Sequence, residues 1–332
     1  LTIEKTRKKC EGLPSYVTDF IIYLETSTSP LTRLNYVLDL KLFFNFLSSK
    51  IFSKDILKIE LSDLNSITSK HIDQYLSFIS QYNLNGKNLS NNNSSKSRKL
   101  SSIRSLFKFL FDRDMILANV STKVKTPKIN EKSIVRLEPN EVAKLINFAE
   151  NPTLFTKRMQ SYCSITKIRD VALLSLLLGT GIRVSECVGI DVDDINFEDN
   201  AFKIVRKGGN EVVLYLSSEV AQSLKEWIEE RNQNEKIPEN EKALFVSLQN
   251  KRIGVRAVEN LVQKYSKMIN PLKNISPHKL RSTYGTNLYR ETKDIYIVAN
   301  VLGHKDVNTT KKHYAAIGED MRRDASMKVK LR

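Results

Sequence analysis

Cysteine, tryptophan and long apolar runs are scarce in this chain of 332 residues. It contains three cysteines, one tryptophan and four histidines. The three widely spaced thiols, Cys10, Cys163 and Cys187, fit neither a disulfide framework nor a zinc site, so we expect a reducing, cytoplasmic environment. No apolar run approaches the roughly 20 residues that cross a bilayer, and residues 1–13 hold no apolar leader segment. We therefore expect neither a membrane span nor secretion.

Positive charge is abundant. Lysine and arginine number 53 against 37 aspartates and glutamates, which gives a formal net charge of +16. Residues 1–136 hold 22 basic and 12 acidic side chains and the remainder 31 and 25, so both halves are positive. This distribution favours contact with a phosphate backbone, although a basic protein that is merely soluble would share it.

The first part of the chain has the apolar spacing of helices. Apolar residues recur at helical intervals over 16–47 and 72–79, and the polar, Asn-rich stretch 83–97 predicts a loop. A fourth helix is expected over about residues 96–113. Its polar face carries a basic stripe with little acid to balance it, which we interpret as a DNA contact rather than a solvated face: Lys96, Arg98, Lys99, Arg104 and Lys108.

Residues 121–136 are rich in lysine and poor in apolar side chains, the composition of an extended interdomain linker. Lys123, Lys125 and Lys128 within it are added to the predicted DNA-binding residues. We therefore expect a helical DNA-binding domain over residues 1–120, this linker, and a second domain over residues 137–332.

The second domain is predicted to be mixed, mostly helical with a small β-hairpin, so that the fold class is mainly α. Two β-prone runs, 201–206 and 211–216, flank Lys207-Gly208-Gly209-Asn210, and two glycines between alternating runs are typical of a hairpin turn. Helices are expected over residues 142–148, 219–231, 255–268, 279–290, 295–302 and 308–315, with one more in the tail from Glu319.

Three short segments place charged or titratable groups at expected helix starts. In the first, Gly179-Thr180-Gly181 bends the chain before Arg183, where helix-start amides and a guanidinium form a competent phosphate site. Glu186 shares the face of Arg183 and could orient it. Alone, this segment also fits an ordinary salt-bridged helix turn. Neighbouring Cys187 fits a small buried thiol better than a nucleophile.

The second segment is Ser276-Pro277-His278-Lys279-Leu280-Arg281, in which His278 and Arg281 are three residues apart and share a helix face. The third is Leu302-Gly303-His304, followed ten residues after the histidine by Tyr314. A lone histidine or helical tyrosine is more often a packing residue. However, three of the four histidines fall in the last 55 residues, each beside other motif residues.

Together these segments resemble the signature of the tyrosine recombinase (phage integrase) family, in order and at plausible spacing: Arg183, Lys207, the box His278-Lys279-Leu280-Arg281, His304 and Tyr314. The match includes a Gly-Thr-Gly turn and a glutamate three residues after the arginine, here Glu186. It covers residues 137–332 well, whereas residues 1–127 match only in helical character and basic charge. The arrangement is similar to two-domain Xer and Cre-like members and to mobile-element integrases.

One segment departs from the family pattern. The family's hairpin lysine often lies in Gly-Lys-Gly, whereas this chain reads Arg206-Lys207-Gly208-Gly209. Lys207 is the expected counterpart because it leads into the glycine turn, and the adjacent Arg206 is the alternative.

The resemblance implies a role for each motif residue. Arg183 and Arg281 would clamp the non-bridging oxygens of a phosphodiester. Tyr314 would attack phosphorus to form a 3′-phosphotyrosyl link, while Lys207 would protonate the leaving 5′ oxygen. Of the remaining motif residues, His278 would be the base or proton relay, His304 a donor to the phosphate, and Glu186 a support for Arg183 or His278.

No metal or other cofactor is expected, because the arginines neutralise the phosphate charge. Three nearby aspartates, Asp191, Asp193 and Asp194, read better as an acidic turn than as a Mg²⁺ site. The resemblance further implies double-stranded DNA with paired recombination sites, a homotetramer that exchanges strands through a Holliday junction, and an accessory directionality factor. The tail from Glu319 would dock on a neighbouring protomer.

Several functions remain compatible with these residues. Integration or excision of a mobile element and Xer-like resolution of chromosome dimers both fit, at a nucleoid-associated location. A type IB topoisomerase-like relaxase would use the same chemistry, and a DNA-binding protein on the same scaffold would use none of it. A helical transcription factor bound through the basic stripe would leave the coincidence of the C-terminal motifs unexplained.

Overall fold

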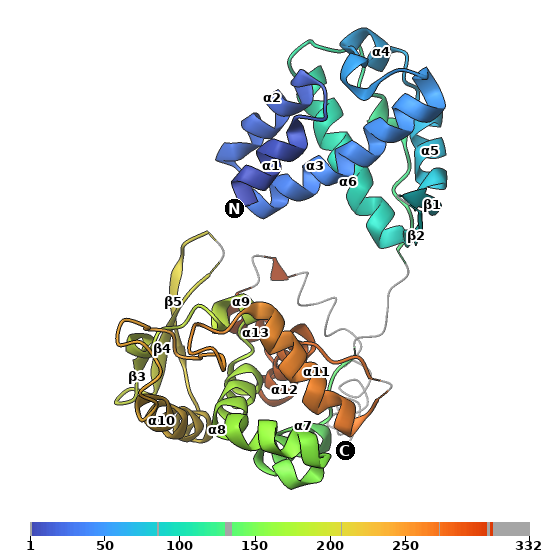
Figure 1. The fold of residues 1–332 in the computed structure, drawn as a ribbon. Coiled ribbons are helices and arrows are strands. Elements are labelled where there is room, and N and C mark those ends of the chain that lie inside the picture. The colour runs from blue at the N-terminus through green and yellow to red at the C-terminus, as the bar shows by residue number, and fades with distance from the viewer. Residues whose placement is uncertain are drawn as a thin grey trace, which may run out of the picture. The chain divides into compact units, whose positions relative to one another are not determined.

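The computed structural model describes residues 2–84, 86–129, 135–206, 208–271, 273–303 and 306–307. The chain divides into two compact units, residues 1–132 and 133–332, and this boundary falls within the predicted linker. Helices dominate both units, so the mainly α fold class is confirmed (Figure 1). In the described ranges no helix is both long and apolar enough to cross a membrane.

The first unit packs its helices around an aromatic core. The ring of Phe43 lies 5.1 Å from that of Tyr75 and 6.5 Å from that of Phe107, and all three side chains are fully buried. Burial of such rings stabilises helices that would be marginal alone. The elements are α1 (Thr2–Cys10), α2 (Ser15–Tyr23), α3 (Pro30–Phe46), α4 (Leu61–Asn65), α5 (Ser69–Phe78), β1 (Gln81–Leu84), β2 (Lys87–Ser90) and α6 (Asn93–Phe111), with a short 3-10 helix at Val120–Lys123.

The loop predicted over residues 83–97 is wrong. Strands β1 and β2 form an antiparallel hairpin there, and Gly86 in its turn has a φ of 77°. The side chain of Asn92 then caps α6 by accepting the backbone N–H of Ser95 at 2.9 Å. The polar composition concealed both elements, because an exposed hairpin needs no apolar alternation and asparagine suits turns and helix caps as well as loops.

The second unit is organised around α8 (Lys157–Thr180), against which α7, α10 and α12 pack. The sheet and α10 lie on one side of α8 and α7 and α11 on the other (Figure 1). The predicted hairpin is confirmed as β4 (Ala201–Val205) and β5 (Glu211–Tyr215), and β3 (Ile195–Asn196) pairs with β4 as a third strand. The remaining helices are α7 (Pro139–Glu150), α9 (Val184–Cys187), α10 (Ser218–Asn232), α11 (Val255–Ile269), α12 (Pro277–Thr292) and α13 (Ile295–Leu302).

A buried carboxylate joins α8 to α11. Asp170 is fully buried and accepts hydrogen bonds from Arg169 Nη2 at 2.8 Å, Lys264 Nζ at 2.9 Å and Tyr265 Oη at 2.9 Å. The pKa of the Tyr265 phenol is raised by burial and by the charge of Asp170, so it remains a protonated donor. Two cations and a phenol thus share one carboxylate in the core of the unit.

We expect Asp170→Ala to lower the free energy of unfolding of the second unit by about 3–5 kcal/mol, because Arg169 and Lys264 would lose their buried counterion. The single tryptophan, Trp227, lies in the core of this unit, so its fluorescence in urea reports the loss there alone. Asp193→Ala, at an exposed position, is the matched control and should change stability by less than about 0.5 kcal/mol. Equal stability of the two variants would contradict the assigned role of Asp170.

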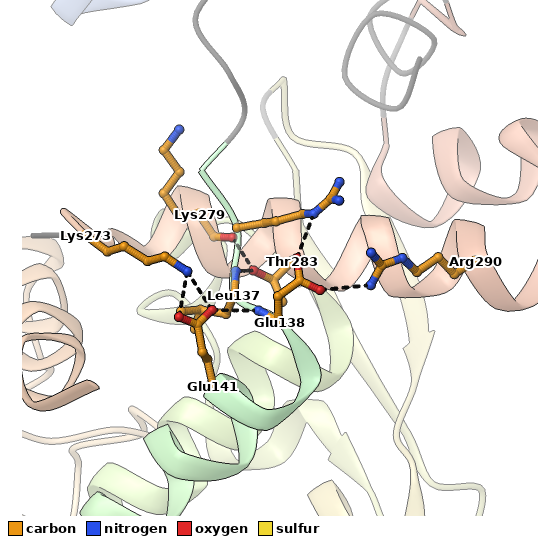
Figure 2. A network of polar contacts seen from close by, with 8 residues as sticks. Leu137, Glu138, Glu141, Lys273, Lys279, Thr283 and Arg290 are labelled. Carbon is orange, nitrogen blue, oxygen red and sulfur yellow. Dashed lines mark hydrogen bonds and ion pairs between the residues drawn. The ribbon is translucent and has the colours of Figure 1, made fainter. Parts of the chain in front are cut away.

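A second polar network fixes the start of α7 (Figure 2). The backbone N–H of Leu137 donates to Thr283 Oγ1 at 3.0 Å, which ties the chain before α7 to α12. Glu141 accepts from Lys273 Nζ at 2.6 Å and from the Glu138 backbone N–H at 2.9 Å. Burial alone would raise the pKa of Glu141, but these two donors outweigh it and hold the pKa below its ordinary 4.5.

This network predicts a pH-dependent coupling between Glu141 and Lys273. Because the folded-state pKa of Glu141 lies below its unfolded value, its contribution is full above pH 4.5 and is lost as the pH falls through the folded value. A double-mutant cycle of Glu141→Gln and Lys273→Met, followed by Trp227 fluorescence in urea, should give a coupling of about 1 kcal/mol at neutral pH. It should shrink as the pH falls below 4.5. A coupling that stays constant with pH would contradict the ion pair.

Candidate active site

The turn between α8 and α9 presents the first predicted motif. Gly181 ends α8 in the left-handed region, with a φ of 63°, and turns the chain toward Arg183. The buried Glu186 carboxylate accepts the backbone N–H of Arg183 and its Nη1, each at 2.7 Å. The Arg183 side chain is 39% exposed, whereas that of Glu186 is 4% exposed. Glu186 therefore orients a guanidinium that solvent can reach.

Gly179 does not contribute to this bend, contrary to the sequence prediction. It lies within α8, where a Cβ would come within 2.5 Å of Val220 Cγ2 on α10. Its missing side chain lets α10 approach α8.

Helix α12 carries the second motif. His278 lies exposed in its first turn, and Ser276 and Pro277 begin the helix as predicted. Arg281 is 4% exposed and donates from Nη1 to the Gly181 carbonyl at 2.7 Å and from Nη2 to the Leu302 carbonyl. Arg281 thus joins the bend after α8 to the end of α13.

Guanidinium groups from three elements converge on the last turn of α13. Arg281 binds the Leu302 carbonyl, and Arg183 Nη2 lies 3.4 Å from the Gly303 carbonyl oxygen. Arg206, at the end of β4, donates to the Val301 carbonyl at 2.7 Å. The end of a helix exposes carbonyl groups without helical partners and carries partial negative charge, which explains its attraction for cations. The sequence motifs pointed to Arg183 and Arg281, whereas they gave no signal for this contact of Arg206.

Three predicted catalytic residues, Lys207, His304 and Tyr314, lie outside the described residues, as does the tail from Glu319. The described residues that precede two of them in the chain are Arg206 and Gly303, and both belong to the cluster at the end of α13. The roles of Lys207, His304 and Tyr314 therefore remain predictions.

The basic residues of the α6 stripe differ in whether they face solvent or bond to other parts of the protein. Lys96 is partly exposed, and Lys108 is exposed and pairs with Asp112 at 2.8 Å. Arg104 donates to the Val124 carbonyl and to Thr126 Oγ1, so it fastens the following chain to α6. Exposed lysines continue along that chain at positions 123, 125 and 128.

The predicted exposure of Lys99 is wrong. Lys99 is 9% exposed, and its Nζ lies 3.5 Å from the carboxylate of Asp39, which is itself 3% exposed. Arg98 and Ser102 donate to the same carboxylate. A buried carboxylate requires cationic and polar neighbours, and the helix turns Lys99 inward to supply one. Contact of the remaining stripe with DNA stays a prediction.

The cysteine and aspartate alternatives are not supported as reactive sites. Cys187 is fully buried, and burial raises the pKa of its thiol to about 12, far from the thiolate that a nucleophile requires. Asp191 pairs with Arg252. Within the described ranges, no three His, Cys, Asp or Glu side chains gather as a metal site would require.

Comparison of the sequence with protein families gives two matches. Residues 135–320 match the model of the phage integrase family, and residues 17–114 match the phage integrase N-terminal SAM-like domain. The tyrosine recombinase XerC of Caldanaerobacter subterraneus subsp. tengcongensis is 30% identical over 326 residues, covering 94% of this chain and 86% of that protein. The tyrosine recombinase XerS of Streptococcus agalactiae serotype III is 30% identical over 348 residues, covering 97% of each.

Solved structures share the fold at lower identity. A XerH site-specific recombinase bound to a palindromic difH substrate, in a post-cleavage complex, superposes with a TM-score of 0.68 at 18% identity, covering 98% of this chain and 94% of that one. A lambda integrase tetramer bound to a Holliday junction gives a TM-score of 0.63 at 17% identity, covering 90% of this chain and 76% of the other.

Proposed function

The chain belongs to the phage integrase family of tyrosine recombinases, and from this premise we propose that it cleaves and rejoins DNA through a 3′-phosphotyrosyl bond to Tyr314. The strongest support is the convergence of Arg183 and Arg281 at the end of α13, immediately before His304 in the chain. Two guanidiniums from separate elements are the groups that a phosphodiester needs, because charge accumulates on its non-bridging oxygens during attack.

The proposed cleavage step conserves atoms and charge. Tyr314 Oη attacks phosphorus and its proton passes to His278, while the bond from phosphorus to the 5′ oxygen breaks. Lys207 protonates that oxygen, and attack by a 5′ hydroxyl on the phosphotyrosyl bond later reverses the step. Arg183, held by Glu186, and Arg281 stabilise the pentavalent state, with His304 as a further donor. No metal has a role in this step.

Binding and assembly are proposed by analogy with relatives. We propose that double-stranded DNA with paired sites is the substrate and that four copies exchange strands through a Holliday junction. The neighbours solved on a difH substrate and on a Holliday junction support this assignment. Contact of the α6 stripe and of Lys123, Lys125 and Lys128 with DNA belongs to the same proposal. So do a cytoplasmic, nucleoid-associated location and an accessory directionality factor.

Covalent trapping tests the chemistry directly. The protein is incubated with labelled DNA that carries a nick beside the cleavage site. Cleavage then releases a short fragment that bears the 5′ hydroxyl, and religation fails because this fragment diffuses away. We expect a labelled protein band on a denaturing gel, and mass spectrometry should locate the nucleotide adduct on Tyr314. DNA binding without any adduct, or an adduct on another residue, would contradict the proposal.

A paired-site assay distinguishes recombination from relaxation. A recombinase exchanges flanking DNA between two sites, whereas a type IB topoisomerase-like relaxase removes supercoils without exchange. Exchange products that require both sites are expected. Relaxation that is independent of site pairing would favour the relaxase alternative.

A further inference from the structure

We propose that Arg206 is a positioning residue: by binding the last turn of α13, it fixes the root of the β4–β5 hairpin and thereby directs Lys207, the next residue in the chain, toward the leaving 5′ oxygen. This inference rests on the proposed function, since it takes cleavage by Tyr314 with Lys207 as the acid.

The side chain of Arg206 connects two elements that are far apart in the sequence. Nη2 donates to the Val301 carbonyl at 2.7 Å and Nη1 to the Asn300 carbonyl at 3.4 Å, across 95 and 94 residues. Burial lowers the pKa of Arg206, which the charge of nearby Glu186 opposes, but a guanidinium remains protonated under all ordinary conditions. A permanent cation therefore lies at the negative end of α13.

The backbone of Arg206 closes the hairpin turn. Its N–H donates to the Asn210 carbonyl at 2.8 Å, and its carbonyl accepts the Gly209 N–H at 3.0 Å. Gly208 and Gly209 both have positive φ, of 100° and 83°, a backbone that only glycine adopts easily. Strand pairing and these backbone bonds hold the hairpin together, and the side chain of Arg206 adds a bond from its root to α13.

The end of α13 leaves space for the Arg206 guanidinium. Gly303 caps α13 with a φ of 62°, and a Cβ at this position would overlap the Arg206 guanidinium. Arg206 therefore couples the root of the hairpin to the end of α13.

Arg206 itself is poorly suited to be the acid, which was the alternative left by the sequence. A general acid needs a pKa near the working pH, whereas a guanidinium holds its proton too tightly. Its two terminal nitrogens also donate to backbone carbonyls. A role that acts through Lys207 fits both facts.

A sulfur-substituted substrate shows whether an Arg206 variant is slow because the acid is misplaced or because the structure is generally disturbed. In a 5′-bridging phosphorothiolate the bond from phosphorus to sulfur breaks, and the thiolate leaves without needing a proton because its conjugate acid is far stronger than an alcohol. We expect Arg206→Ala to slow cleavage of the ordinary nicked substrate by about 10- to 100-fold. On the phosphorothiolate substrate it should cleave within about threefold of the wild-type rate.

Three further variants sharpen this test. Arg206→Lys keeps the charge but can reach only one carbonyl, so an intermediate rate is expected on the ordinary substrate. Lys207→Ala should also be rescued by sulfur, and adding Arg206→Ala to it should cause little further loss, because both act on one step. Lys203→Ala removes a cation from an exposed position of the same strand and should leave both rates unchanged.

The outcomes are distinguishable. Wild-type speed of Arg206→Ala on the ordinary substrate, or equal slowing on both substrates, would overturn the positioning role while leaving the proposed function intact. Absence of a Tyr314 adduct in the wild-type protein on either substrate would overturn the proposed function, and the role of Arg206 with it.

Discussion

Tyr314→Phe is expected to abolish the covalent protein–DNA adduct and all strand exchange. Phenylalanine keeps the ring but lacks the oxygen that attacks phosphorus. We expect cleavage to fall by about 10⁴-fold or more, with DNA binding nearly unchanged. Labelled nicked DNA on a denaturing gel measures the adduct, and a mobility-shift assay measures binding.

The matched control for this variant is Tyr296→Phe. Tyr296 lies on α13 and is 69% exposed, so removal of its hydroxyl should leave cleavage at the wild-type rate. An adduct that persists in Tyr314→Phe would show that another group is the nucleophile. An adduct that disappears equally in both variants would show that the loss is not specific to Tyr314.

Arg281→Lys is expected to lower the rate of cleavage by about 10²- to 10³-fold, the effect of removing one preorganised donor from a charged transition state. Lysine keeps the charge but cannot reproduce the planar fork that donates to the Gly181 and Leu302 carbonyls. The bend after α8 and the end of α13 would then lose their common partner, which would also misplace Arg183. The trapping assay at saturating protein measures the rate.

Because Arg281 is buried, a loss of activity must be separated from a loss of fold. Trp227 fluorescence in urea gives the stability of the second unit for each variant. Arg290→Lys, a few turns further along α12, is the matched control and should cleave at close to the wild-type rate. Wild-type cleavage by Arg281→Lys would contradict the phosphate-clamp role. So would a control variant with the same loss of stability that cleaves as slowly as Arg281→Lys.

Several elements of the second unit were readable from the sequence, although the helix α8 was not predicted. Apolar periodicity predicted α10 to α13 because each helix buries one face, and two adjacent glycines predicted the turn between β4 and β5. The prediction failed over residues 83–97, where a polar hairpin and a capped helix start have the composition of a loop. An element that buries one face has apolar residues at regular intervals in the sequence, whereas an exposed element needs no such pattern.

The direction in which single cations point was not readable. Lys99 and Lys108 belong to one apparent basic stripe, yet Lys99 turns inward to Asp39 and Lys108 stays in solvent. That difference depends on a carboxylate 60 positions earlier in the chain on α3, which helix periodicity does not encode. An inward-facing charge is stable only where a partner from another element meets it.

The sequence by itself determined the family, the mainly α fold and the order of the motif residues, because these follow from local spacing and residue type. Only the tertiary structure decided that Arg183, Arg206 and Arg281 meet at the end of α13. The contacts of Arg183 and Arg206 there bridge 120 and 94 to 95 residues. No local preference selects such partners. They are selected by the packing of α8, α12 and the β4–β5 hairpin, which brings the carbonyls at the end of α13 within reach of the guanidiniums.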